Sequence, residues 1–181
     1  MKAIEIITYD SFITEALVRV AESMLLAAKT APKARGIDNI KGIYVTGSTI
    51  KKIAEKMIIM GEKDEQAFFV RDAFNIVQAP VLVLLGTAIK PINLKKCGLC
   101  GFGNCEGKIN HKDAPCAFNT GDLGIAIGSA VSIAMDNRID NRVMFSVGMA
   151  VRELNILGKD IKIAYGIPLS ANSKNIFFDR G

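Results

Sequence analysis

The residues best suited to chemistry in this chain are its four cysteines, which all lie between positions 97 and 116. Their pattern is C-x2-C-x4-C-x10-C, formed by Cys97, Cys100, Cys105 and Cys116. Thiolates must converge on one centre to bind a metal, and a short segment brings them together with little loss of chain entropy. The pattern therefore predicts a metal or cluster site with these four cysteines as ligands.

Two cofactors suit four thiolate ligands, namely a tetrahedral zinc ion and an iron–sulfur cluster. Zinc ribbons usually have two C-x2-C pairs, whereas Cys105 and Cys116 are separated by ten residues. Gly98, Gly101 and Gly103 permit tight turns that direct backbone N–H groups toward an anion. These features favour an iron–sulfur cluster, with zinc as the alternative.

Lysines and the only histidine of the chain surround the cysteines. The lysines are Lys90, Lys95, Lys96, Lys108 and Lys112. They form either a solvated basic face or a set of charges that compensates an anionic centre, because a four-thiolate cluster has a formal charge of about −2. Nucleic-acid binding is not expected, since no aromatic-rich or arginine-rich stripe accompanies the lysines. His111 could replace a thiolate in a zinc site, but on this polar loop we expect it to be exposed.

The composition predicts a folded domain with a small appended module. The chain has 181 residues, of which 50% are apolar and 23% are charged, and its net charge is +5. The start of the chain, Met1 to Asp10, is too short and too mixed for a signal peptide, and no apolar run of about 18 residues predicts a membrane span. We therefore expect a cytoplasmic protein, in which close-set cysteines are ligands more often than disulfides.

Apolar spacing and turn residues predict the elements that must position the cysteines. Helices are expected over residues 11–30, 48–60, 64–78, 122–135 and 140–157. Strands are expected over residues 40–46, 81–85 and 161–165, the second being buried on both faces. Asp10 or Ser11 would cap the first helix, Gly61 would end the second, and Asp122 would cap the fourth. The interleaving predicts a layered α/β or α+β fold with the cysteine segment inserted.

The predicted helix over residues 122–135 has an unusual face of small residues. Gly124, Gly128 and Ser132 recur at a spacing of four, which allows another helix to approach closely. We expect this face to be packed either in the core or at the seam of a dimer.

The cysteine segment also resembles a known module. Cys97-Gly98-x-Cys100-Gly101-x3-Cys105, followed by Cys116, is similar to the small 4Fe–4S domain of corrinoid iron–sulfur proteins and of the ferredoxin-like subunit of membrane electron-transport complexes. The resemblance covers residues 91–118 and implies a 4Fe–4S cluster. With this segment, the whole chain resembles the prokaryotic family described as ferredoxin-domain-containing proteins of unknown function.

The rest of the chain resembles the fold of flavin-dependent nitroreductases. Four short motifs occur in that family's order: Ala31-Pro32 before a strand, Ala79-Pro80-Val81-Leu82, Asp122-Leu123-Gly124-Ile125-Ala126, and Tyr165-Gly166-Ile167-Pro168. The resemblance implies an α+β core over residues 1–90 and 119–181, interrupted by the inserted segment 91–118. It also implies an obligate homodimer, with a seam formed by the helices predicted over 122–135 and 140–157, and FMN at the interface.

A flavin phosphate would need cations, and the candidates are Lys33, Arg35, Lys174 and Arg180. The alternative is that these side chains are exposed charges that aid solubility. The amino-acid residues alone predict no catalytic site, because the sequence lacks a phosphate-binding loop and its single histidine leaves no spare imidazole for a Ser-His-Asp triad. Any chemistry would be supplied by the cofactors. We expect a redox protein that passes electrons to a flavin, a partner protein or a small-molecule acceptor. The alternative is a non-enzymatic dimeric binding protein with a structural zinc site.

Overall fold

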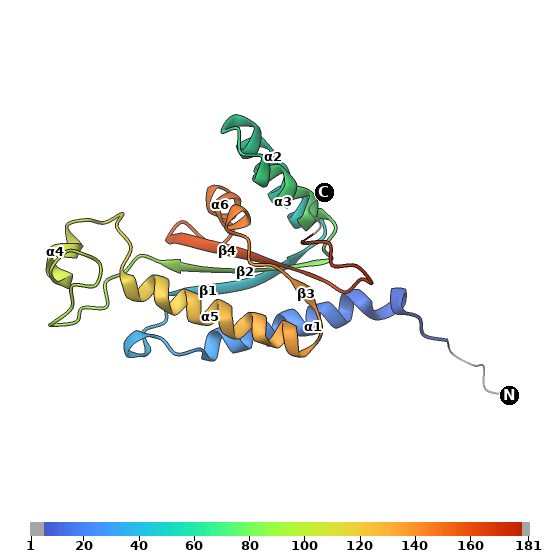
Figure 1. Cartoon of the computed structure of the whole chain (residues 1–181). Helices are drawn as coiled ribbons and strands as arrows, with labels where there is room; N and C mark the ends of the chain where they lie inside the picture. Colours follow the sequence, from blue (N-terminus) through green and yellow to red (C-terminus); the bar gives the residue numbers. More distant parts are fainter. Residues whose placement is uncertain (1–5, 179–181) are drawn as a thin grey trace.

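The computed structural model describes residues 6–178 and has a four-stranded antiparallel sheet with helices on both faces (Figure 1). The strand order is β1-β2-β4-β3. The strands are β1 (Ile40–Thr46), β2 (Val81–Ala88), β3 (Asp140–Asn141) and β4 (Ile161–Ser170). The helices are α1 (Tyr9–Thr30), α2 (Ser48–Lys63), α3 (Ala67–Val77), α4 (Cys105–Ile109), α5 (Ala117–Asp136) and α6 (Phe145–Glu153), with a short 3₁₀ turn over Ala34–Gly36. The predicted α+β class is confirmed.

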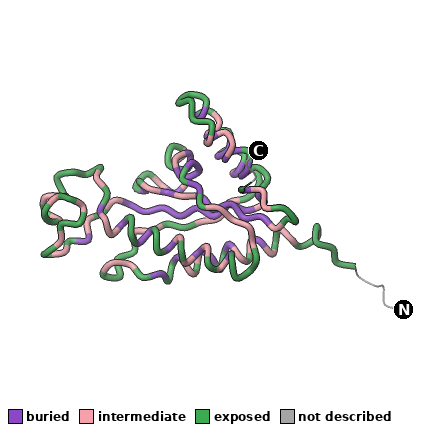
Figure 2. The backbone as a smooth tube through the Cα atoms, viewed as in Figure 1, coloured by how far each residue is buried: buried purple, intermediate pink, exposed green. Residues whose placement is uncertain are grey.

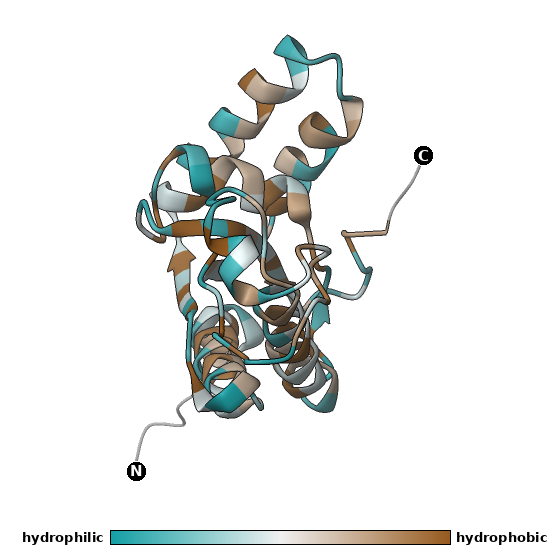
Figure 3. Ribbon diagram, turned by 90° about the vertical axis from the view of Figure 1, so that its left-hand side faces the viewer, coloured by the Kyte–Doolittle hydropathy of each residue, from teal (hydrophilic) through white to brown (hydrophobic). Residues whose placement is uncertain are grey.

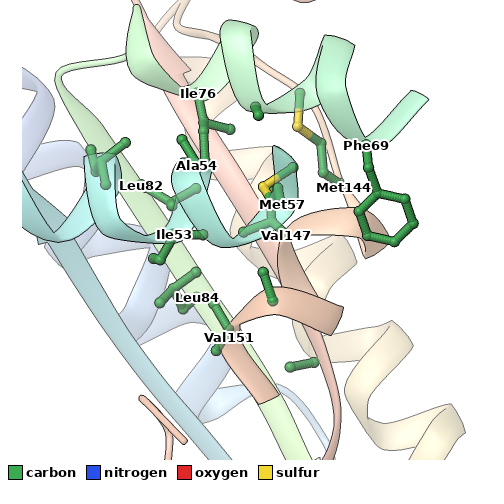
Figure 4. Close-up of a cluster of buried hydrophobic side chains, with 14 of the residues drawn as sticks. Ile53, Ala54, Met57, Phe69, Ile76, Leu82, Leu84, Met144, Val147 and Val151 are labelled. Carbon is green, nitrogen blue, oxygen red and sulfur yellow. The ribbon is translucent and has the colours of Figure 1, made fainter. Parts of the chain in front are cut away.

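Strand β2 is the centre of the molecule, and all of its residues are buried. Because side chains alternate along a strand, its residues divide between two hydrophobic cores. Val81, Val83 and Leu85 pack with α1 and α5, whereas Leu82 and Leu84 pack with α2, α3 and α6 (Figure 4). Each such buried side chain contributes about 1.5–3 kcal/mol. The predicted strand with two buried faces is confirmed, and it extends three residues beyond Leu85.

The sheet separates the helices into two groups, one on each of its faces. Figure 3 shows α1 and α5 side by side on one face of the sheet, with α2, α3 and α6 on the other. Buried backbone follows the sheet and the inner sides of the helices, whereas the end that holds α4 is mostly exposed or half-buried (Figure 2). The cysteine segment therefore lies at one end of a conventional two-core body.

The helix predicted over residues 140–157 is much shorter in the structure. Residues 140–141 form β3, Met144 pairs with Gly166 of β4, and the helix runs only from Phe145 to Glu153. Met144 N donates to Gly166 O at 2.8 Å, and Gly166 N donates to Met144 O at 3.0 Å. Pairing with a distant strand thus overrides the local helical spacing of the apolar residues.

Gly61 does not end α2, which continues to Lys63. A Cβ at Gly61 would lie 2.9 Å from the Cβ of Phe69, so the missing side chain lets α3 pack closely against α2. Gly61 is buried at this helix crossing, and α3 begins at Ala67 rather than at residue 64. The prediction that this glycine is a helix terminator was wrong, because tertiary packing explains it instead.

The start of α1 also differs from the prediction. The residue that precedes the first helical turn is Thr8, so neither Asp10 nor Ser11 is the cap. The hydroxyl of Ser11 donates instead to Thr8 O at 2.6 Å. Within residues 6–178, no helix is long and apolar enough to cross a membrane.

Candidate metal centre

The four cysteines lie on the segment that leaves β2 after Ala88 and returns to the body at the start of α5 (Figure 1). Cys97, Cys100 and Cys105 are half-buried and Cys116 is buried, and all four are free thiols. Among residues 6–178, no three cysteine, histidine or acidic side chains lie close enough together to hold a single metal ion. The structure thus gathers the cysteines on one segment, while their convergence on a common cofactor stays a prediction.

Glycines set the backbone path of this segment. Gly101 and Gly103 have φ values of +86° and +72°, a left-handed conformation that other residues adopt only with strain. A Cβ at Gly98 would lie 2.9 Å from Gly103 O, and a Cβ at Gly107 would lie 2.6 Å from Phe102 O. The chain therefore folds back on itself between the cysteines at a distance that only glycine permits. Such tight turns suit a thiolate centre that also needs backbone N–H donors.

The short helix α4 begins at Cys105 and is held by local contacts. The side chain of Asn104, which precedes it, accepts a hydrogen bond from Gly107 N at 2.8 Å. Just beyond the helix, the exposed ring of His111 stacks on Phe102 with a centroid distance of 4.5 Å. The predicted exposure of His111 is confirmed.

Helix α5 begins five residues earlier than predicted, because Cys116 precedes its first turn. Asp122 is therefore not its cap. Its buried carboxylate instead accepts from Ala34 N, with both oxygens at 3.1 Å, and so ties the loop after α1 to α5. The unpaired N–H groups of a long helix favour negative charge at its start. Cys116 thus lies beside the unpaired backbone N–H groups at the start of a long helix.

Two buried residues beside the cysteines have side-chain donors that lack acceptors among residues 6–178. Asn119 lies in the first turn of α5 and is 1% exposed; its Oδ1 accepts from Lys90 N at 2.8 Å, but its buried Nδ2 has no partner among residues 6–178. Lys108 in α4 is 2% exposed, and its side chain has no hydrogen bond or ion pair with the described part of the chain. Buried donors are normally paired, so an anionic centre held by the cysteines fits this segment.

The cations predicted for a flavin phosphate are dispersed. Lys33 Nζ donates to three carbonyl oxygens at the end of α1, those of Ala28, Lys29 and Ala31, at 2.8–2.9 Å. Arg35, which has a φ of +56°, donates to Ile92 O at 3.1 Å and so ties its loop to the cysteine segment.

The other two predicted cations lie elsewhere. Lys174 follows β4, whose last residues pair with the opposite end of β2 from the one that leads to the cysteines. Arg180 lies outside the described residues. A common site for Lys174 and the loop that holds Lys33 and Arg35 therefore requires two subunits.

An apolar cavity adjoins the cysteine segment. It has a volume of about 430 Å³, and its walls include Leu99, Ala34, Phe118 and Ile125. Leu99 lies between Cys97 and Cys100 and is 73% exposed, so the cavity opens to solvent directly beside these two cysteines. A small planar molecule could bind here through apolar contacts.

A larger cavity of about 650 Å³ lies beside the edge strand β1, and its lining contains no cysteine. Its charged groups include a pair in which Lys29 Nζ lies 2.6 Å from Asp38 Oδ2. Partial burial has the largest single effect on Asp38 and opposes its ionisation. The hydrogen bonds from Lys29 Nζ and Ile40 N and the positive charges of Lys33 and Lys29 together outweigh it and lower the pKa of this carboxyl. Nearby, Lys41 lies 3.1 Å from Asp160 and lowers the pKa of that exposed carboxyl. Nothing in this lining indicates redox chemistry.

Sequence comparison identifies the family. The profile described as "Uncharacterized protein containing a ferredoxin domain (DUF2148)" matches residues 112–180, a range that includes Cys116. An uncharacterized protein of Archaeoglobus fulgidus is 36% identical over 176 residues, which cover 93% of this chain and 94% of that protein. Identity of this extent along nearly the whole chain establishes common membership of one family.

Comparison with solved structures identifies the fold. A nitroreductase family protein from Clostridium novyi NT aligns with a TM-score of 0.58 at 14% identity, over 96% of this chain and 81% of that one. A BluB-like flavoprotein from Clostridium difficile 630 aligns with a TM-score of 0.55 at 19% identity, over 86% and 84%. NfrA2 of B. megaterium aligns with a TM-score of 0.53 at 16% identity over 87% of this chain, which spans 58% of the length of NfrA2. The chain therefore belongs to the family of uncharacterized proteins that contain a ferredoxin domain, and its body has a nitroreductase-like fold.

Proposed function

We propose that this chain is an iron–sulfur redox protein in which Cys97, Cys100, Cys105 and Cys116 hold a 4Fe–4S cluster. The observation that carries the proposal is that one segment, whose tight turns depend on glycine, holds four free thiols. The ferredoxin domain named in the family description supports it. When bound, such a cluster supplies one-electron transfer.

The residues of the chain would bind and orient this centre. The start of α5 favours a thiolate at Cys116, and the turns at Gly101 and Gly103 let the chain wrap around a compact anion. We further propose that residues 1–90 and 119–181 form the core and that 91–118 are an insertion. The body would hold both ends of the insertion, because Arg35 binds its first part and Asp122 anchors the loop that carries Arg35.

We propose that the apolar cavity beside Leu99 binds the electron acceptor. Its neighbours Ala34 and Phe118 come from the body, so the cavity joins the core to the cysteine segment. FMN is the acceptor that the fold suggests, since similar structures include a BluB-like flavoprotein and an oxidoreductase containing FMN. A flavin can collect two electrons that arrive singly. A redox partner protein docking near the lysines is the other acceptor consistent with the site.

Phosphate binding by Lys33, Arg35, Lys174 and Arg180 stays a prediction. In the single chain, Lys33 and Arg35 bind backbone carbonyls, and Lys174 lies at the other end of the sheet. We therefore propose that any such phosphate site forms between the subunits of a homodimer.

The dimer would use the small-residue face of α5. Gly124 and Gly128 are exposed, and a Cβ added at either would meet no atom within 4 Å, so this face is not packed in the core of the chain. We expect the protein to have twice the chain mass of 19.5 kDa, and Gly128→Glu to yield the monomer, because a buried carboxylate at a close helix contact is costly. Sedimentation equilibrium would measure both masses. Ser48→Glu, at an exposed position on the opposite helical layer, should leave the mass unchanged. A dimer that survives Gly128→Glu would exclude this face.

A reduction experiment tests the proposed function. Anaerobically prepared protein treated with dithionite should give a paramagnetic resonance signal of about one unpaired spin per chain, because a 4Fe–4S cluster accepts one electron. Protein in which all four cysteines are serine should give none. A wild-type protein that is silent and contains zinc would instead support the structural zinc site and the non-enzymatic binding function.

A further inference from the structure

Burial distinguishes one lysine of the cysteine segment from the others. Lys90, Lys95, Lys96 and Lys112 are exposed, whereas Lys108 is 2% exposed. Lys108 lies in α4, three residues after Cys105, at the end of the molecule that the cysteine segment forms (Figure 1). A solvated basic face explains the four exposed lysines, but it does not explain Lys108.

A lysine as buried as Lys108 needs a nearby anion for its ammonium group. Burial of an unpaired charge is strongly unfavourable, and lysine is almost never fully buried without a partner. The carboxylates of the segment do not provide one, because Glu106 and Asp113 are exposed and neither forms an ion pair with Lys108. The groups of this segment that remain able to carry negative charge are the four cysteines.

Asn119 presents a second unpaired donor on the other side of the segment. Its Oδ1 accepts from Lys90 N at 2.8 Å, which fixes the orientation of the amide. Its Nδ2 is then left buried without an acceptor among residues 6–178. Asn119 lies three residues after Cys116, and helical side chains lean toward the start of their helix, so the amide lies on the side of this cysteine.

We propose that Lys108 and Asn119 are positioning residues that stabilise negative charge on the centre held by the cysteines and so raise its reduction potential. The inference rests on the proposed function. Reduction adds one electron, and therefore one negative charge, without moving a proton. The ammonium group of a buried lysine and an amide N–H both favour the more negative state, and the lower dielectric constant of a partly water-excluded site strengthens their effect.

The test compares Lys108→Gln with Lys112→Gln, which removes the same charge from an exposed position of the same segment. The readout is the ratio of oxidised to reduced cluster in an anaerobic titration with dithionite and mediators. At a fixed potential, Lys108→Gln should raise this ratio about tenfold or more, which corresponds to a midpoint about 59 mV lower for one electron. Lys112→Gln should change it less than about twofold, and added salt should remove that change but not the effect of Lys108→Gln.

Further variants separate charge from packing. Lys108→Arg keeps the charge and should keep a potential close to that of the wild type. Asn119→Asp keeps the oxygen that binds Lys90 N but replaces the donor, and it should also raise the fraction of oxidised cluster. Equal potentials for Lys108→Gln and Lys112→Gln would overturn the proposal for Lys108, and an unchanged potential in Asn119→Asp would overturn it for Asn119.

Two other outcomes are distinguishable from these. Loss of iron in both Lys108→Gln and Lys108→Arg would show that Lys108 serves packing, and it would overturn the proposal. A wild-type protein without any cluster would refute the proposed function itself, and this inference with it. Iron content, measured on each sample before the titration, separates the two cases.

Discussion

Replacing Cys116 with serine is expected to remove most of the iron from the protein while its helices and sheet stay folded. The substitution deletes one of the four proposed thiolate ligands, and serine binds iron poorly. Cys116 also precedes the first turn of α5, a position at which serine is a preferred cap. We therefore expect iron to fall from about four to less than one per chain, with the free energy of unfolding of the metal-free protein changed by less than about 1 kcal/mol.

Metal analysis and circular dichroism of the same samples would measure both effects. Thr120→Ser, one residue beyond the first turn of α5, is the control and should retain full iron, since its hydroxyl donates to Ala117 O and binds no other group among residues 6–178. Retention of iron in Cys116→Ser would show that Cys116 is not a ligand. Unfolding of the whole body would instead indicate a structural metal site, at which metal binding is coupled to folding.

Gly148→Ala is expected to destabilise the fold by about 3 kcal/mol or more, at the upper end of the range for overpacked cores. Gly148 lies in α6 where this helix crosses β4, and an added Cβ would overlap the carbonyl group of Ala164. The obstacle is backbone in the sheet rather than the end of a flexible side chain. The helix must therefore move away from β4, and this movement would disturb the packing of Val147 and Val151 shown in Figure 4.

Both substitutions are made in the monomeric Gly128→Glu background, because Gly121 lies on the same side of α5 as Gly128. In that background Gly121→Ala is the matched control, since it adds the same methyl group to another helix. A Cβ at Gly121 would meet no atom within 4 Å, and alanine is a better helix former than glycine by about 0.8–1.0 kcal/mol. Urea unfolding of the two variants should therefore shift in opposite directions. A cost of less than about 1 kcal/mol for Gly148→Ala would mean that α6 packs less closely on β4 than the structure indicates.

The parts of the fold that sequence predicted correctly are those set by local pattern. Strand β1 follows its β-branched and aromatic residues and has the predicted bounds. Strand β2 follows a continuous apolar run, which requires burial on both faces. Helix α1 has apolar residues at helical spacing, whereas helix α5 lies in a largely apolar stretch. The structure confirms both helices, although α5 starts earlier than predicted.

The errors occur where distant contacts decide the conformation. The segment before α6 has helical spacing, but its Met144 pairs with Gly166, twenty-two residues later. Gly61 has the signature of a helix end, but its missing side chain instead leaves room for Phe69 where α2 and α3 cross. Asp122 has the signature of a cap, but its carboxylate holds Ala34 N, eighty-eight residues away. None of these partners is visible in a window of neighbouring residues.

In the candidate site, too, the sequence predicts what local pattern sets and misses what depends on distant contacts. The cysteine pattern identifies the ligands by residue type and spacing, and the lysines around it suggest charge compensation. Sequence could not show that Lys108 alone among them is buried. It also could not show that Asn119 Oδ1 is hydrogen-bonded while its Nδ2 has no partner in the part of the chain that the structure describes. A signal for Asn119 was present, because it follows Cys116 by one helical turn, but its meaning depends on where α5 begins.

Inorganic sulfide and iron, measured on protein purified without oxygen together with its visible spectrum, show whether the four cysteines hold a 4Fe–4S cluster. Sulfide distinguishes a cluster from any single metal ion bound by the same cysteines. We predict about four irons and about four sulfides per chain, with a broad absorption near about 400 nm that bleaches on reduction. A colourless protein with about one zinc per chain and no sulfide would show that no cluster is bound, and the cysteine segment would then be a structural zinc site.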